Sequence, residues 1–298
     1  MFSADKMGVA NKPLPLQAGV AAARRQRPVI LLSLLCLDAP FVAVAWQWII
    51  ARNLGEPLNL PQCAVLFLAA WLIYLSDRLA DSLTVPPGAP TSARQRFCRQ
   101  HRVIIVPLIV LLGITDTILS LSFIDRRTFI SGTLIFGATG VYLAINHFAS
   151  RTWRHVPVKE AAIGFLFALG TVAVINQKST HLVVVLMLFG LLCSLNCLSI
   201  SVWERDLDIA QGRESFATAH PKRKSLPAMS CWIVGVIGIA LLIDSKLRLF
   251  AFCLASSALL LALLHRVGRI DRDERVALAD LVLLIPAVVF LSYFSHIR

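Results

Sequence analysis

Residues 181–203, HLVVVLMLFGLLCSLNCLSISVW, contain no Asp, Glu, Lys or Arg. A helix needs about 20 mostly apolar residues to cross the hydrocarbon core of a bilayer. Apolar runs of this kind recur along the chain at residues 29–50, 61–83, 103–124, 128–148, 158–176, 226–244, 248–266 and 276–295. The sequence therefore predicts an all-α, polytopic membrane protein built as a nine-helix transmembrane bundle.

The composition agrees with a membrane environment. Of the 298 residues, 57% are hydrophobic and 15% are charged, whereas soluble domains average roughly 45–50% apolar and about 25% charged residues. The net charge of +12 would favour a nucleic-acid partner in a soluble protein. Because the placement of the basic residues explains this charge as membrane topology, we expect the lipid bilayer as a partner and no nucleic acid.

The basic residues alternate between the two sides of the predicted bundle. The N-terminal tail and the loops after the second, fourth, sixth and eighth spans hold 22 of the 29 Lys and Arg residues, and the other side holds 7. Basic loops stay in the cytoplasm, so we expect a cytoplasmic tail over residues 1–27 and one transmembrane domain over residues 28–298. The long polar loops 84–102 and 204–225 put the active face in the cytoplasm, and the whole pattern fits a multi-pass protein of a bacterial inner membrane.

A first acidic motif ends the predicted span 61–83. Asp77 and Asp81 are four residues apart and share one helix face. Like charges near hydrocarbon are costly, and Mg²⁺ relieves the repulsion because it binds one or two carboxylates together with phosphate oxygens of a substrate. The alternative is a helix-end pair neutralised by Arg78 and the loop arginines, which is the commoner situation for such a motif taken alone.

A second acidic motif repeats this spacing at the end of the predicted span 181–203. Glu204 and Asp208 lie on the same side of the membrane as the first pair, so the two pairs can hold cations that bridge one diphosphate. Three arginines can add charge-assisted contacts to its oxygens: Arg78, Arg205 and Arg213. The alternative is the solvated, charge-mixed start of a loop.

Other polar residues are expected on the same face. Lys159 can bind a phosphate as a point charge, or it only anchors its helix at the cytoplasmic surface. Polar residues inside spans usually face a cavity, and Asn146, His147, Asn196 and Asp280 could orient an acceptor or act as a base.

Two further features have a weaker relation to this face. Asp116 lies toward the opposite side and has no assigned role. The basic segment 91–102 predicts an interfacial helix, which either contacts anionic lipid headgroups, the interpretation we favour, or caps the site.

In the joint order and spacing of these motifs the chain resembles the UbiA superfamily of intramembrane prenyltransferases, over roughly residues 28–295. The first family motif reads N-D-x-x-D-x-x-x-D; Asp77 and Asp81 match its last two acids, and Ile73-Tyr74 stands in place of its Asn-Asp. The second reads D-x-x-x-D followed by G-x-x-S, and its register is matched by Glu204, Asp208, Gly212 and Ser215. A family Lys followed by Leu-Gly is matched by Lys159 and Leu169-Gly170.

The resemblance implies a divergent, Mg²⁺-dependent transferase that moves an isoprenyl group from its diphosphate to an aromatic or lipid-like acceptor. The implied metal ligands are Asp77, Asp81, Glu204 and Asp208. The implied catalytic cations are Lys159, Arg78 and Arg205, and the implied substrate contacts are Tyr74, Asn146, Asn196 and Arg213. Two alternatives remain: a terpene cyclase of the same fold, and a non-catalytic lipid-binding or transport protein.

Overall fold

The computed structural model describes residues 28–148, 158–268 and 270–295, and within these ranges every regular element is a helix. In chain order the helices are α1 (Pro28–Leu34), α2 (Asp38–Leu54), α3 (Leu60–Leu83), α4 (Ala93–Gln100), α5 (Arg102–Phe123), α6 (Arg126–Phe148), α7 (Val158–Val172), α8 (Thr180–Ala210), α9 (Phe216–Ala219), η2 (Pro221–Arg223), α10 (Leu226–Leu241), α11 (Arg248–Leu264), α12 (Arg272–Val282) and α13 (Ile285–Ser295). The all-α prediction is confirmed for the described residues.

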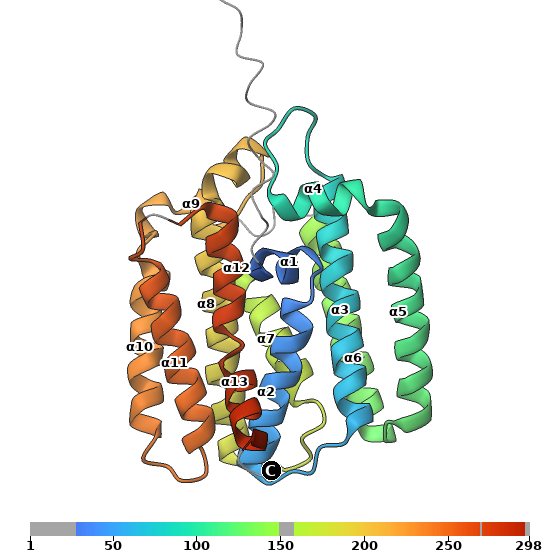
Figure 1. Cartoon of the computed structure of the whole chain (residues 1–298), viewed down its shortest axis with the longest axis vertical. Coiled ribbons are helices and arrows are strands. Elements are labelled where there is room, and N and C mark those ends of the chain that lie inside the picture. The colour runs from blue at the N-terminus through green and yellow to red at the C-terminus, as the bar shows by residue number, and fades with distance from the viewer. Residues whose placement is uncertain (1–27, 149–157, 269, 296–298) are drawn as a thin grey trace, which may run out of the picture.

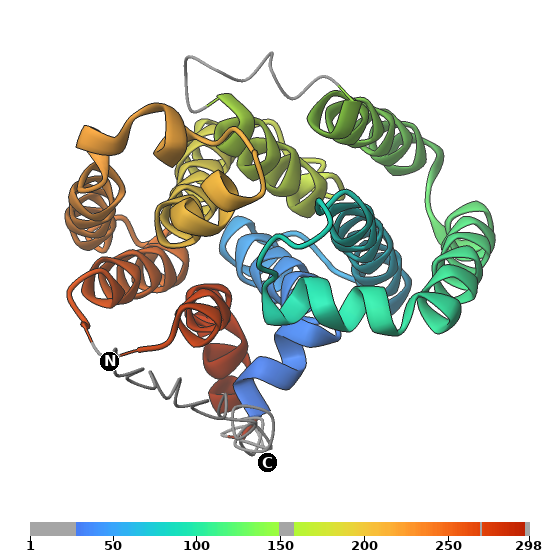
Figure 2. The ribbon, with the colours of Figure 1, turned by 90° about the horizontal axis from the view of Figure 1, so that it is seen from above.

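The long helices stand side by side as a bundle (Figure 1). The short helices α4 and α9 lie at one end, which we call the α4 end, and the α2–α3, α5–α6, α7–α8 and α10–α11 connections lie at the opposite end. Helix α2 packs against α3 and α7 and also against α11, α12 and α13. Both halves of the chain therefore meet around α2 (Figure 2).

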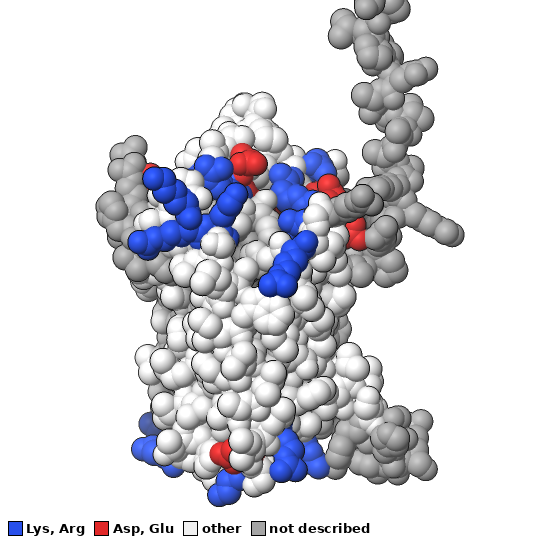
Figure 3. All heavy atoms as spheres, turned by 90° about the vertical axis from the view of Figure 1, so that its left-hand side faces the viewer, with Lys and Arg blue, Asp and Glu red and all other residues white. Residues whose placement is uncertain are grey.

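The surface of the bundle suits a lipid environment. In the described part of the chain, five helices are long and apolar enough to cross a membrane, and the bent pair α12–α13 makes up to six. Large apolar side chains are exposed along them, such as Val103 at 79% and Leu134 at 69%. On the face drawn in Figure 3, charged side chains gather at the two ends and leave a band between them without Lys, Arg, Asp or Glu. An apolar surface of this extent indicates an integral membrane protein.

The first expected span, 29–50, is broken. Helix α1 ends at Leu34, Cys36 adopts a positive φ of 56°, and α2 starts at Asp38. Pro40 lacks the N–H that would continue a helix through this point. One residue earlier, Ala39 N donates to the Asp38 carboxylate at 3.0 Å and leaves the Leu35 carbonyl, which accepts from the indole Nε1 of Trp71 at 3.1 Å. This contact matters because an unpaired backbone carbonyl in hydrocarbon is costly.

The last expected span, 276–295, is broken in the same way, between α12 and α13, with a bend of 47°. Pro286 removes the N–H that would pair with the Val282 carbonyl four residues earlier. Two side chains supply substitutes: the Ser257 hydroxyl donates to Val282 O at 3.1 Å, and Trp46 Nε1 donates to Leu283 O at 2.8 Å. The Val282 and Leu283 carbonyls at the break are therefore both hydrogen-bonded.

Helix α8 is longer than the expected span 181–203, because it continues to Ala210. Glu204 and Asp208 therefore lie on the last turns of a helix, not at the start of a loop, and the interpretation of this segment as a solvated loop start is wrong. Helix α8 packs closely on α7, since a methyl group added at Gly164 would collide with Ser194 and one added at Gly190 would meet the Phe165 ring. Small residues allow this approach of two helix backbones.

Candidate functional site

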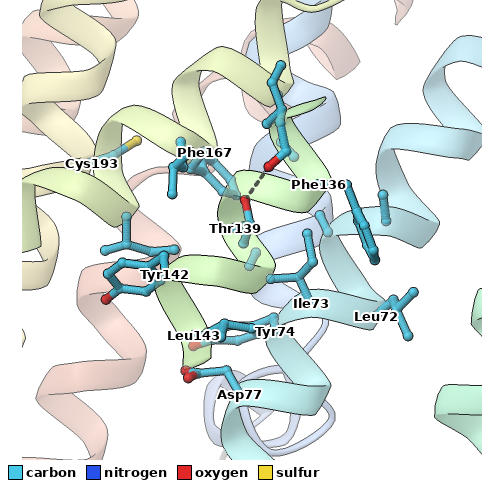
Figure 4. Close-up of a pocket in the computed structure, with 18 of the residues that line it drawn as sticks. Leu72, Ile73, Tyr74, Asp77, Phe136, Thr139, Tyr142, Leu143, Phe167 and Cys193 are labelled. Atoms are coloured by element: carbon cyan, nitrogen blue, oxygen red, sulfur yellow. Dashed lines mark hydrogen bonds between the residues drawn. The ribbon is translucent and has the colours of Figure 1, made fainter. Parts of the chain in front are cut away.

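A cavity of about 800 Å³ lies inside the bundle among α2, α3, α5, α6, α7 and α8. Its wall at the α4 end carries the charged side chains Asp77, Arg78, Asp81, Lys159, Glu204, Asp208 and Arg213. Beyond them the wall is mostly apolar, and Figure 4 shows Ile73 and Leu72 of α3 with Phe136 of α6 and Phe167 of α7. Such a cavity fits an amphiphilic ligand with a charged head and an apolar body.

The two acids of the first motif meet a histidine from another helix. Asp77 and Asp81 lie on the last turns of α3, and His147 lies on the last turn of α6. His147 Nε2 is 3.9 Å from Asp77 Oδ1, and ligand atoms of all three residues lie within 4.8 Å of one another. Among the described residues, this is the group of His, Cys, Asp and Glu whose geometry could hold a metal ion. Two carboxylates suit Mg²⁺ when phosphate oxygens complete its shell.

Asp81 is also tied to the second motif through Arg213. Helix α8 ends in a left-handed turn at Gly212, whose φ is 67°, and Arg213 N donates to Asp208 O at 2.8 Å. This C-terminal cap turns the chain toward α3. Arg213 Nη1 then lies 3.2 Å from Asp81 Oδ1, and its Nη2 donates to the Asp81 carbonyl at 2.7 Å.

Glu204 is likewise paired with an arginine, which comes from helix α4. Helix α4 begins at a Ser92 capping box with Gln95, and its second residue, Arg94, is only 7% exposed. Arg94 Nη2 lies 3.1 Å from Glu204 Oε1. Burial and the nearby Arg78 lower the pKa of Arg94, but Glu204 and other neighbours raise it more, so the net pKa lies above the ordinary value and the guanidinium stays charged.

Arg94 also reaches the last span and the first motif. Its Nη1 is 3.7 Å from Asp280 Oδ2 and 3.5 Å from the Tyr74 hydroxyl. The Tyr74 hydroxyl accepts a second hydrogen bond from Arg78 Nη2 at 2.9 Å. Asn196 Nδ2 donates to Asp280 Oδ1 at 2.9 Å. Tyr74, Arg78, Asn196, Glu204 and Asp280 thus form one connected network around Arg94 at the α4 end.

The structure brings most of the predicted site residues to this cavity. Its lining includes all four predicted metal ligands, the cations Lys159, Arg78 and Arg213, and the polar residues Tyr74, Asn146 and Asn196. Arg205 is not part of the lining, because its Nε donates to Ala217 O at 3.2 Å and its Nη1 pairs with Asp206 at 3.3 Å. The predicted metal ligands are divided: Asp77 and Asp81 converge with His147, whereas Glu204 faces Arg94.

Two buried charged residues at this end of the bundle were missed by sequence reasoning. Arg94 belongs to the basic segment that we assigned to lipid headgroups, and its burial corrects that interpretation. Glu160 is 5% exposed and its Oε1 accepts a hydrogen bond from Phe216 N at 3.3 Å. Glu160 follows Lys159 in the first turn of α7, where an acid is favoured by the helix dipole, but no spacing in the sequence connects it with α9.

Asp116, which had no assigned role, lies on the cavity wall. Helices α3 and α5 are antiparallel neighbours, and a methyl group added at Gly113 would lie 3.7 Å from Leu72 Cδ2. At about 1.5 Å of rise per residue, Asp116 therefore lies about 12 Å deeper in the cavity than Asp77. The cavity therefore extends well beyond its charged end and carries a second acid, Asp116, in its deeper part.

Comparison of the chain with protein-family models, with curated proteins and with solved structures finds no match.

Proposed function

We propose that this protein is a metal-dependent intramembrane prenyltransferase, a divergent member of the UbiA superfamily, that moves an isoprenyl group from its diphosphate to an aromatic or lipid-like acceptor. The observation that carries the proposal is the cavity: two acidic pairs from distant segments, with Lys159, Arg78 and Arg213, line one end of a space that is otherwise mostly apolar. The diphosphate head of an isoprenyl diphosphate would bind at the charged end, and its isoprenyl chain would bind along the apolar wall.

The proposal includes nine membrane spans with a cytoplasmic N-terminus. Broken helices α1–α2 and α12–α13 each count as one span, and the shorter helices α7 and α11 count as one span each beside α3, α5, α6, α8 and α10. The distribution of 22 basic residues on one side and 7 on the other supports the α4 end as cytoplasmic. The charged end of the cavity then faces the compartment in which soluble isoprenyl diphosphates are present, in a bacterial inner membrane.

The residues present fit a divalent cation at Asp77, Asp81 and His147. Bound Mg²⁺ would supply charge neutralisation at the leaving diphosphate. Lys159, Arg78 and Arg213 line the same end and stabilise the negative charge that builds on the diphosphate oxygens as the bond to C1 of the isoprenyl chain breaks. The oxygen keeps the electron pair of that bond, and an allylic cation remains.

The apolar wall protects this cation. Water is excluded from a cavity lined by side chains such as Leu72, Phe136 and Leu143. The aromatic faces of Tyr74 and Tyr142 lie near Asp77 (Figure 4) and can stabilise positive charge. The acceptor carbon or heteroatom attacks C1, the new bond forms, and the released diphosphate accepts the proton that the acceptor loses.

The test is diphosphate release by purified protein in nanodiscs, supplied with Mg²⁺ and allylic diphosphates of several chain lengths. We expect release that requires Mg²⁺ and is lost in Asp77→Ala and Asp208→Ala. Arg205→Ala is the matched control, because Arg205 lies off the cavity, and it should retain most of the activity.

Product mass then separates the outcomes. A product heavier than the isoprenyl group by one acceptor supports transfer, and a hydrocarbon formed without any acceptor supports the cyclase. No release with any chain length, with membrane extract present as a source of acceptor, would overturn the proposal and favour the lipid-binding or transport protein.

A further inference from the structure

The second acidic pair differs from the first in what faces it. Each pair has one acid beside an arginine, since Arg213 Nη1 lies 3.2 Å from Asp81 Oδ1 and Arg94 Nη2 lies 3.1 Å from Glu204 Oε1. The difference lies in the third group: His147 adds a possible metal ligand to Asp77 and Asp81, whereas Arg94 adds only positive charge beside Glu204. Arg94 also faces Asp280 at 3.7 Å. These contacts are largely shielded from solvent, since the side chains of Arg94, Glu204 and Asp280 are 8%, 16% and 13% exposed.

Arg94 reaches these acids from behind the cavity wall. Glu204, Asp280 and Tyr74 line the cavity, but Arg94 is not among the lining residues of the described chain. Its guanidinium therefore neutralises the acids without occupying the space of a ligand. An arginine in this place resists displacement, because it is held by its own helix α4, by Glu204 and by the Tyr74 hydroxyl.

Tyr74 contacts both Arg94 and Arg78. The position is occupied by a phenol whose hydroxyl accepts from Arg78 at 2.9 Å and lies 3.5 Å from Arg94 Nη1. A carboxylate at residue 74 would add a metal ligand between the two motifs, whereas the neutral phenol adds only a hydrogen-bond acceptor. Among the described residues, no third His, Cys, Asp or Glu converges with Glu204 and Asp208 as His147 does with Asp77 and Asp81.

We propose that Arg94 takes the place of a second metal ion, so that the protein binds a diphosphate head with one divalent cation, at Asp77, Asp81 and His147. This inference rests on the proposed function and specifies its metal site. Asp208 then balances the positive charge of Lys159 and Arg213, which line the same end of the cavity. Arg94 is a positioning residue that acts through Glu204.

The experiment counts ions on the full chain in nanodiscs by equilibrium dialysis against Mn²⁺ and inorganic diphosphate. We expect one Mn²⁺ per bound diphosphate in the wild type. In Arg94→Gln the unpaired Glu204 and Asp280 should recruit another Mn²⁺, which gives two per diphosphate. Arg94→Lys keeps the charge and should keep the count at one.

Glu204→Gln is the variant that keeps the inference testable if Arg94→Gln does not fold. It should leave the count at one and change the affinity for Mn²⁺ less than twofold. Two Mn²⁺ per diphosphate in the wild type, or loss of an ion in Glu204→Gln, would overturn the inference and leave the proposed function standing. A wild type that binds neither Mn²⁺ nor diphosphate would overturn both.

Discussion

Arg94 and Glu204 are 110 residues apart in the chain, yet Arg94 Nη2 donates to Glu204 Oε1 at 3.1 Å. The pair joins α4, which follows the first acidic motif, to the end of α8, which carries the second. A pair of hydrogen bonds between Gln95 and Gln211, at 2.9 and 3.1 Å, connects the same two helices. The charged end of the cavity is therefore held together by contacts between the segments that carry the two motifs.

The Arg94–Glu204 pair should be strongly coupled in stability. Removing one partner of a buried pair leaves a charge without its counter-ion, and we expect Arg94→Gln or Glu204→Gln to lower the unfolding free energy by about 2–3 kcal/mol. The double variant should recover at least about 1 kcal/mol of the summed loss. Denaturant unfolding in detergent micelles, followed by tryptophan fluorescence, measures all three values.

The control is an exposed ion pair on α8, the helix that carries Glu204. This pair is Arg205 and Asp206. The distance between them is 3.3 Å, but the Asp206 side chain is 95% exposed, so solvent screens the interaction. The corresponding double-variant cycle should show no measurable coupling. Equal coupling in the two cycles would contradict the burial argument.

The spans of the fold could be predicted because a bilayer imposes a length and a polarity that a single segment carries by itself. The runs 61–83, 103–124 and 128–148 correspond to α3, α5 and α6 within a few residues. The breaks within the first and last runs had a local signal in Pro40 and Pro286, which hydropathy alone conceals. The sequence could not show that the indoles of Trp71 and Trp46 donate hydrogen bonds to the backbone carbonyls at these breaks. These contacts join segments that are far apart in the chain.

The candidate site could be predicted where a motif is local and not where a partner is distant. Asp77 and Asp81 share a helix face by spacing alone, and the structure puts them together. Nothing near Arg94 in the sequence distinguishes it from Arg96, Arg99 and Arg102, although only Arg94 is buried against Glu204. Arg205 shows the converse error: its position beside Glu204 suggested the cavity, but the helix turns it toward Ala217.

Gly164 should not tolerate a side chain. A methyl group there would collide with Ser194 of α8, and overpacking of a tight helix contact costs about 1–3 kcal/mol. Gly164→Ala should therefore lower the unfolding temperature. Gly170→Ala on the same helix is the control, since nothing lies within 4 Å of its added methyl group, and it should be neutral or stabilise by up to about 1 kcal/mol. A similar loss in both variants would refute close α7–α8 packing.

Asp125 should act as a pH-dependent cap of α6. Its Oδ1 accepts hydrogen bonds from Thr128 N at 3.0 Å and Arg127 N at 3.1 Å. The hydrogen bonds from Thr128, followed by that from Arg127, lower the pKa of Asp125 below its ordinary value. A depressed folded-state pKa stabilises the protein above the unfolded value of about 3.9, and this contribution is lost as the pH falls through the folded pKa.

Asp125→Ala should therefore destabilise the protein by about 0.5–1 kcal/mol near neutral pH. The difference from the wild type should shrink as the pH falls below about 4. Asp125→Asn keeps an oxygen acceptor without titration, and its stability relative to Asp125→Ala should not depend on pH. Unfolding midpoints measured from neutral pH to below about 4 test this expectation. A stability difference between the wild type and Asp125→Ala that stays constant to the lowest pH would contradict the charge-based cap.

His147 should decide which metal ion the first motif prefers. An imidazole nitrogen favours a transition-metal ion such as Co²⁺ over Mg²⁺, which is bound mainly by oxygen ligands. We expect His147→Gln to weaken Co²⁺ binding at least about tenfold and Mg²⁺ binding much less, because Asp77 and Asp81 remain. Calorimetric titration with each ion in the presence of inorganic diphosphate measures the difference.

His181→Gln is the matched control. His181 also faces a carboxylate, Asp244 at 3.2 Å, but at the opposite end of the bundle, and its replacement should leave both affinities unchanged. If His147→Gln weakens Co²⁺ and Mg²⁺ equally, His147 acts on the carboxylates by hydrogen bonding and is not a ligand.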